Sequence, residues 1–146
     1  MRIRIFPDEV LKVPTEKVVV FNPDLRDKAI RMYKLMVRED GAGLAAPQVG
    51  IGMAFFVVEK TLLPHIIIAN PIWKPAVGSK TYMAEEGCLS FPGLWVEIPR
   101  YDKIDVEYQC VDNRIHKSTL DGFAAHVFQH EEEHTRGILM TDHLSK

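Results

Sequence analysis

Cysteine is scarce in this 146-residue sequence, which contains only Cys88 and Cys110. Two cysteines are too few for the disulfide framework that holds small secreted proteins together. The opening residues, MRIRIFPDEV, reach a proline and two acids too soon to contain the apolar region of a signal peptide. We therefore expect a cytoplasmic protein whose thiols are free, buried or bound to a metal ion.

Long apolar runs and an excess of one charge are also missing. The longest apolar stretches, such as residues 53–58, are far shorter than a membrane span. Eighteen basic and twenty acidic side chains give a formal net charge of -2, which provides no electrostatic footprint for nucleic acid or an anionic membrane. We therefore expect no direct nucleic-acid binding and no membrane partner. The length and the 47% apolar content suit a single domain over residues 1–146.

Internal repeats are absent, and so is the alternation of strands and helices that builds a parallel sheet. Asn22 and Pro23 are typical of a helix start, and the apolar spacing behind them predicts an amphipathic helix over about residues 23–38. Strands are expected over residues 53–58, 65–69 (ended by Asn70-Pro71), 103–110 (with Cys110 on its core-facing side) and 114–120. A last helix is expected from a cap at Asp121 to about Arg136. This order predicts an α+β fold, with antiparallel β-sheets packed around a central C-terminal helix.

The last helix contains the run His130-Glu131-Glu132-Glu133-His134. Residues four apart lie about 40° apart around a helix, so the imidazoles of His130 and His134 can bind one metal ion. Glu131 lies about 100° further round than His130 and can reach a water on that ion without being a ligand. The alternative is a solvated acidic face with two incidental histidines. A partly buried metal site is favoured by the apolar residues elsewhere in the helix, namely Phe123, Val127 and Phe128.

A catalytic metal site generally needs a third protein ligand and an open position for water. Zinc peptidases with a third downstream histidine place it where this chain has Met140, and only twelve residues follow His134 for any other downstream ligand. His143 is available, but it lies beyond the expected helix end. An upstream ligand is therefore expected, and Cys88 lies between glycine and proline signals, where backbone can approach a site closely.

Three segments resemble the motifs of one enzyme family, the peptide deformylases. Residues 41–48 (GAGLAAPQ) resemble its G-x-G-L-A-A-x-Q motif, residues 86–90 match its E-G-C-L-S motif, and residues 129–134 (QHEEEH) resemble its Q-H-E-x-D-H helix. The order and spacing are also those of the family. The resemblance implies a hydrolase that releases formate from the N-terminal formylmethionine of a nascent polypeptide.

The resemblance also implies a role for particular residues. Cys88, His130 and His134 would hold one divalent ion, Fe²⁺ natively, although thiolate and imidazole ligands also accept Zn²⁺, Ni²⁺ or Co²⁺. Glu131 would act as general base and then general acid. The Gln48 side-chain amide and the Leu89 backbone N–H would stabilise the oxyanion.

Substrate contacts are carried over in the same way. Backbone at Ala42, Gly43 and Gly87 would pair with an extended peptide. Arg100 matches a family arginine assigned to substrate binding, with a surface salt bridge as the alternative. His126 replaces an aliphatic residue of the methionine pocket, where a polar wall could change side-chain preference; a local hydrogen bond is the alternative.

Further departures from the family pattern concern the end of the chain. Glu133 stands where the family has aspartate, and Thr135-Arg136 replaces an apolar residue. The sequence ends at Lys146, without the C-terminal extension of many bacterial members, which weakens the expectation of transient ribosome contact. Bacterial cytosol, or host cytosol for a phage-encoded protein, is the expected location. Two other classes remain open: a zinc peptidase that cleaves internal amides, and a deformylase-like fold that only binds.

Overall fold

The computed structural model describes residues 1–144. Its two α-helices are α1 (Pro23–Arg38) and α2 (Gly122–Thr135), and short 3₁₀ helices are η1 (Glu9–Lys12), η2 (Ala46–Val49) and η3 (Met140–His143). The strands are β1 (Gly43–Ala45), β2 (Phe55–Val58), β3 (Ile67–Pro75), β4 (Thr81–Cys88), β5 (Phe91–Tyr101), β6 (Lys103–Gln109) and β7 (Ile115–Asp121). No helix in this range is long and apolar enough to cross a membrane.

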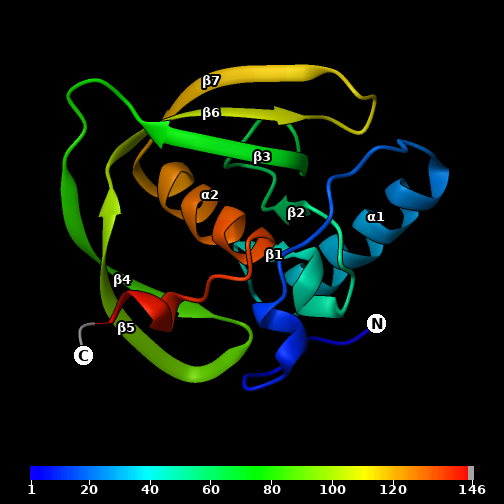
Figure 1. Ribbon diagram of the computed structural model, residues 1–146, viewed down its shortest axis with the longest axis horizontal. Coiled ribbons are helices and arrows are strands. Elements are labelled where there is room, and N and C mark those ends of the chain that lie inside the picture. The colour runs from blue at the N-terminus through cyan, green and yellow to red at the C-terminus, as the bar shows by residue number, and fades with distance from the viewer. Residues whose placement is uncertain (145–146) are drawn as a thin grey trace.

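The strands form two antiparallel sheets around α2 (Figure 1). One sheet has five strands in the order β1-β2-β3-β6-β7, and the other is the β4–β5 hairpin. Figure 1 shows β3, β6 and β7 on one side of α2, the hairpin on the other, and α1 beside β1 and β2. The predicted α+β fold, with antiparallel sheets and a C-terminal helix, is thus confirmed.

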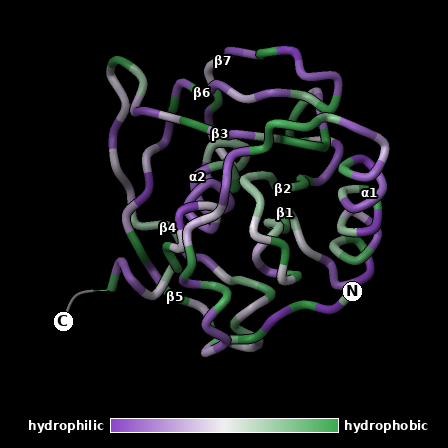
Figure 2. Tube along the Cα trace, turned by 45° about the vertical axis from the view of Figure 1, so that its right-hand side comes forward, coloured by the Kyte–Doolittle hydropathy of each residue, from purple (hydrophilic) through white to green (hydrophobic). Residues whose placement is uncertain are grey.

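Helix α1 forms where its sequence pattern predicts it. The Asn22 side chain accepts a hydrogen bond from the Leu25 backbone N–H at 3.0 Å, and proline occupies the first turn, where its missing N–H costs nothing. Hydrophilic and hydrophobic stretches alternate along its coils (Figure 2). Its apolar stripe packs into the core beneath β1 and β2, through Leu25, Ala29, Met32, Leu35 and Met36.

Helix α2 is more deeply buried than the expected partly buried helix: every residue from 127 to 135 is buried. Most of its buried polar groups are paired, as described below, whereas Glu131 Oε1 and His134 Nδ1 have no hydrogen-bond partner among the described residues. Phe123, counted above as evidence for burial, is instead 58% exposed. Asp121 is the N-cap residue, but its side chain makes no capping hydrogen bond. After the helix, Gly137 adopts a φ of +75°, and a Cβ there would lie 2.6 Å from the Lys12 carbonyl oxygen.

Two strand predictions need correction. Strand β3 begins at Ile67 and continues through Asn70-Pro71, which was expected to end it. A register shift between Ala69 and Ile72 accommodates the proline, and the Asn70 side chain bonds to both Val18 and Gln109. The β4–β5 hairpin was not predicted at all, because its glycines and prolines read as loop signals.

Candidate metal centre and substrate cleft

Helix α2 and the end of β4 bring three potential metal ligands together. The Nε2 atom of His134 lies 3.2 Å from Nε2 of His130 and 3.5 Å from Sγ of Cys88. One ligand atom from each of the three residues lies within 4.8 Å of the others. Two imidazoles and one thiol at this spacing fit a single borderline-soft divalent ion. The fit is supported by the chemistry of the donors; Cys88 and His130 line a cleft, and His134 is buried behind them.

The position of Cys88 depends on a tight reversal between β4 and β5. The ladder pairs Gly87 with Trp95 but Cys88 with Phe91, so the register shifts at this point. A Cβ on Gly87 would lie 2.8 Å from the Trp95 ring, which explains why glycine precedes the cysteine. The hairpin therefore presents the thiol to α2 while the tryptophan lies against the backbone.

A buried carboxylate orients His130. Glu86 Oε2 lies 2.6 Å from Nδ1 of His130, and Oε1 lies 2.7 Å from Nε2 of His126. Arg100 adds two bonds of 2.8 Å to the same carboxylate. Although burial alone would raise the pKa of Glu86, bonds with His126, His130 and Arg100 hold it well below its usual range. A carboxylate on the far nitrogen of a ligating histidine is the usual support of a metal site.

The structure places Arg100 beneath the cleft rather than in it. Its side chain is 2% exposed, and it bridges Glu86 to Glu133, whose Oε1 it reaches at 2.8 Å. The Glu133 carboxylate also lies 2.8 Å from Nε2 of His143. Arg100 is not among the residues that line the cleft. Both expectations for Arg100 are thus revised: it does not face the substrate cleft, and its ion pairs are buried rather than on the surface.

Glu131 lies beside the three candidate ligands. Its Oε2 atom is 3.9 Å from Nε2 of His130, while its buried Oε1 has no hydrogen-bond partner among the described residues. Burial raises the pKa of Glu131 to about 7, with His130 opposing the shift. A Cβ on Gly43 would lie 2.7 Å from Glu131 Oε2, so β1 backbone packs directly on this carboxyl group. A group of this kind can both accept and donate a proton near neutral pH.

Gln48 is held by its own segment. Its Oε1 atom accepts the Ala45 backbone N–H at 2.9 Å, which fixes the orientation of the amide. Nε2 donates to Oγ of Ser90 at 3.1 Å and lies 3.5 Å from Sγ of Cys88. The side-chain amide is therefore a fixed donor next to the candidate metal ligands, and Leu89 follows Cys88 along the cleft wall.

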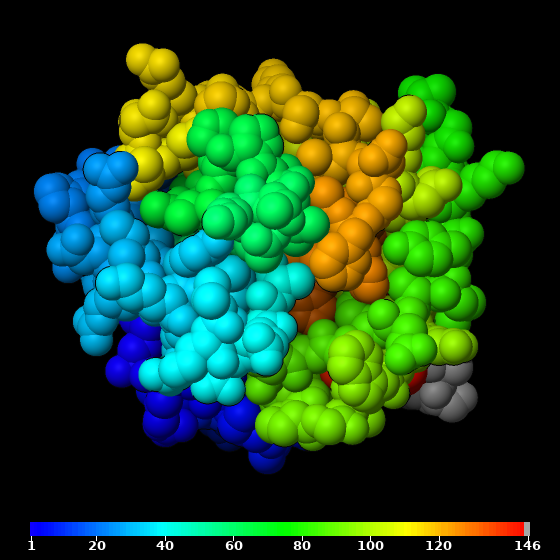
Figure 3. Space-filling view, turned by 180° about the vertical axis from the view of Figure 1, so that it is seen from behind, coloured from blue at the N-terminus to red at the C-terminus, as the bar shows by residue number. Residues whose placement is uncertain are grey.

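These residues border a cleft of about 690 Å³. Figure 3 shows it as a hollow between the cyan segment around β1 and η2 and the green β4–β5 hairpin, with the orange α2 at its side. Most of the expected site residues line it: Ala42, Gly43, Gln48, Gly87, Cys88, Leu89, His126, His130 and Glu131. His126 thus meets both expectations, because it lines the cleft and also makes a local hydrogen bond.

Several lining residues were missed by the sequence analysis. Exposed apolar side chains at Leu94, Trp95 and Phe123 stand at the rim, and residues 2–5 of the N-terminal segment contribute Arg2, Ile3 and Ile5. Their signal in the sequence is weak, because the apolar residues among them do not follow the periodic spacing of a helix or a strand. They come together only where the β4–β5 hairpin, the start of α2 and the N-terminal segment border the same cleft.

Two departures from the family pattern have local partners. The longer Glu133 side chain joins Arg100 to His143. Thr135 donates its hydroxyl to the Glu132 carbonyl, and the Arg136 guanidinium binds the Glu132 carboxylate with two bonds of 2.7 Å. Polar contacts therefore hold the end of α2 at a position where the family pattern has an apolar residue.

Comparison with known proteins gives matches over the whole chain. The model of the polypeptide deformylase family matches residues 1–146. A peptide deformylase of Thermotoga maritima is 43% identical over 144 residues, which cover 99% of this chain and 87% of the relative. A crystal structure of peptide deformylase from Thermotoga maritima superposes with a TM-score of 0.91, at 41% identity, covering 99% of this chain and 97% of that one. A Synechococcus elongatus peptide deformylase in complex with actinonin gives 0.93, at 32% identity, covering 99% and 79%.

Antiparallel sheets around a helix that carries H-E-x-x-H beside a cysteine place the chain among metal-dependent hydrolases. More narrowly, the chain belongs to the polypeptide deformylase family, whose members remove the formyl group from the N-terminal methionine of nascent peptides. The expected family and enzyme class are confirmed by these matches.

Proposed function

We propose that this chain removes the formyl group from N-terminal formylmethionine at the cleft described above, with Cys88, His130 and His134 as the metal ligands. The observation that carries the proposal is their convergence beside Glu131, a buried carboxyl group with one oxygen left unpaired among the described residues. A metal ligand set without such a group would bind an ion but would lack a proton acceptor.

The proposed native ion is Fe²⁺, with Zn²⁺, Ni²⁺ or Co²⁺ as substitutes. Cys88, His130 and His134 would hold the ion, which would supply Lewis acidity and lower the pKa of a water bound to it. Glu86 and Arg100 act as positioning residues, because the carboxylate holds His130 and the guanidinium holds the carboxylate. This role replaces the substrate contact expected for Arg100.

Glu131 carries the proton. It accepts one from the attacking water as the water oxygen adds to the formyl carbon, and it returns a proton to the amino nitrogen as the C–N bond breaks. Formate and a free amino terminus are the products. The negative charge that develops on the formyl oxygen is stabilised by the Gln48 amide, which its bond to Ala45 pre-orients, and by the Leu89 N–H.

The peptide would bind between two strand edges. In the described sheets β1 pairs only with β2, and β4 pairs only with β5, so each strand has a free edge. Ala42 and Gly43 at the first edge and Gly87 at the second line the cleft. Backbone pairing there is independent of sequence, and His126 forms part of the wall of the first side-chain pocket.

The remaining expectations belong to the same proposal. Residues 1–146 form one catalytic domain that acts in the bacterial cytosol, or in the host cytosol if the source is a phage. Its substrate is the nascent chain, met in transient contact with the ribosome. Neither nucleic acid nor a membrane is proposed as a direct partner, in keeping with the net charge of -2.

The test is formate release from formyl-Met-Ala-Ser by protein reconstituted anaerobically with Fe²⁺. Glu131→Gln should lose at least about 100-fold in rate, because it cannot accept the proton. Glu132→Gln is the matched control: Glu132 is the next residue of α2, but it bonds to Trp73 and Arg136 and does not line the cleft. Its rate should stay close to that of the wild type.

Two results would overturn the proposal. Stoichiometric metal binding without formate release would favour the binding-only class. Cleavage of an unformylated peptide at an internal bond would favour the zinc peptidase class.

A further inference from the structure

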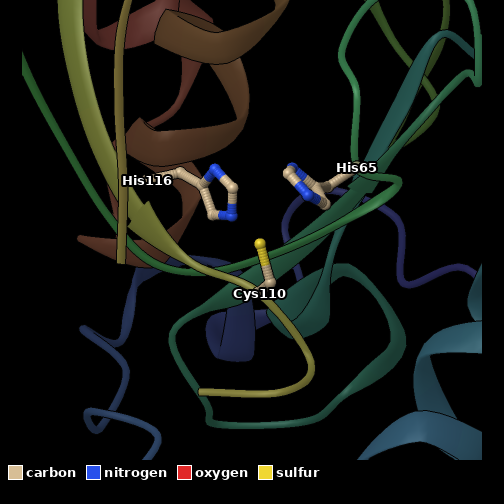
Figure 4. Close-up of side chains that lie close together, drawn as sticks. All are labelled: His65, Cys110 and His116. Atoms are coloured by element: carbon tan, nitrogen blue, oxygen red, sulfur yellow. The ribbon is translucent and has the colours of Figure 1, made fainter. Parts of the chain in front are cut away.

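A second group of metal-ligating side chains lies outside the cleft. His65, Cys110 and His116 each offer one ligand atom, and these atoms lie within 4.8 Å of one another. Figure 4 shows the two imidazoles facing each other with the cysteine sulfur between and below them. None of the three residues lines the cleft. We call this group the hairpin cluster, since two of its members flank the β6–β7 turn.

The register of the sheet builds the hairpin cluster. In the β6–β7 ladder Tyr108 lies opposite His116, and the Cys110 N–H bonds to the Arg114 carbonyl at 2.9 Å. Side chains two residues apart on a strand share a face, so Tyr108, Cys110 and His116 point to the same side. β3 pairs with β6, and His65 lies two residues before β3, in the connection from β2.

Contacts around the hairpin cluster hold the rings in place. The ring centroids of His65 and His116 are 4.1 Å apart, and Nδ1 of His65 lies 2.9 Å from the Tyr108 hydroxyl. Cys110 is a free thiol and is 4% exposed, whereas both histidines are partly accessible.

We propose that His65, Cys110 and His116 form a second metal site, which takes one borderline-soft divalent ion of the Zn²⁺ class. One thiolate and two imidazoles are typical zinc ligands, and solvent can occupy the fourth position because both histidines are partly accessible. The Cys110 thiol releases its proton to solvent as the sulfur binds the ion. The Tyr108 hydroxyl can accept the Nδ1–H of His65 and fix the ring for binding through its other nitrogen.

The bound ion would act as a structural clip rather than as a catalyst. It would join the β2–β3 connection to the β6–β7 hairpin, two segments separated by more than forty residues of sequence. Among the described residues no carboxylate forms a hydrogen bond with a member of the hairpin cluster, and the nearby Asp112 is exposed and paired with Arg114, unlike the buried Glu131. Metal binding should therefore stabilise the fold without adding hydrolysis.

Cobalt absorption on a Cys88→Ser background tests this proposal. Cys110 is then the only cysteine left, so any cobalt–thiolate charge-transfer band must come from the hairpin cluster. We expect anaerobic Co²⁺ to give this band and Zn²⁺ to abolish it by competition. Adding Cys110→Ser should remove the band and weaken Zn²⁺ binding by at least about 10-fold, as loss of even a supporting residue does at metal sites.

A second variant guards against misfolding. His116→Asn removes a partly accessible ligand, and Lys117→Asn is its matched control, since Lys117 is exposed and pairs with Glu107. On the Cys88→Ser background, His116→Asn should lose the rise in Tm that Zn²⁺ produces, and Lys117→Asn should keep it. If folded Cys88→Ser protein shows no cobalt–thiolate band, or if His116→Asn retains the full Zn²⁺ effect, the proposal is wrong and Cys110 is only a core thiol.

Discussion

The two Cys-His-His groups of this protein have the same donors but different surroundings. The cleft cluster, Cys88, His130 and His134, borders a cavity of about 690 Å³ and has Glu86 bonded to one ligand. The hairpin cluster has a tyrosine hydroxyl in the corresponding place. Donor type decides which ion can bind, but a proton acceptor and an open cleft decide whether chemistry follows.

Buried charge is the second difference. Beneath the cleft cluster, Arg100 joins Glu86 and Glu133, and all three side chains are at most 7% exposed. Each charge has been removed from water, so the network stands only while its partners are complete. No member of the hairpin cluster forms an ion pair within the described residues, and the pair of Arg114 with Asp112 in the adjoining turn is exposed. Variants that remove parts of this network test how much it contributes to the stability of the fold and to metal binding at the cleft cluster.

Arg100→Met should have the largest effect on stability. It leaves the Glu86 and Glu133 carboxylates buried without a cation, and we expect a loss of about 3–5 kcal/mol in the free energy of unfolding, measured in urea. Arg114→Met is the control, because its pair is exposed and contributes little. A loss no larger than that of the control would show that Arg100 does not hold the network together.

Glu86→Gln should weaken the cleft cluster without removing a ligand. The amide keeps the shape but loses the charge that holds His130, so metal affinity should fall by about 10–100-fold in a chelator competition assay. Glu85→Gln is its matched control, since Glu85 is the neighbouring exposed residue of β4. Equal affinities in the two variants would remove the orienting role assigned to Glu86.

His126→Ile should have the smallest effect, confined to substrate preference. It replaces a polar side chain of the cleft wall and frees one bond of Glu86. We expect the preference among formyl-Met, formyl-Nle and formyl-Gln peptides, measured as ratios of kcat/KM, to move away from formyl-Gln. The change in these ratios should correspond to about 1–3 kcal/mol. Unchanged ratios would mean that the His126 side chain is turned aside to Glu86 and does not contact the substrate.

The same contrast explains what the sequence could predict. Local patterns were sufficient for α1, whose cap and apolar spacing lie within a few turns, and for the pair of histidines on α2. Family motifs placed Gln48 and Cys88 at the cleft, where the structure has them. All of these features depend on residues close together in the sequence or on motifs whose function is known from the family.

Features that depend on long-range pairing were missed. The sequence around Arg100 does not show that its side chain will pair with carboxylates from β4 and α2. The β4–β5 hairpin that buries it contains glycines and prolines, which indicate loops rather than strands. The hairpin cluster has no motif spacing either. Its histidines meet only because β3 pairs with β6 and because His116 lies opposite Tyr108 in the ladder. Strand register of this kind cannot be read from residue types alone.

The most direct test of this account compares the two thiols. Formate release from formyl-Met-Ala-Ser is measured for Fe²⁺-reconstituted Cys88→Ser and for Cys110→Val, which fills the core with a side chain of similar size. The account predicts a rate near that of the wild type for Cys110→Val and a loss of at least about 100-fold for Cys88→Ser, because only Cys88 holds an ion beside Glu131. Activity retained by Cys88→Ser, or lost in folded Cys110→Val, would contradict it.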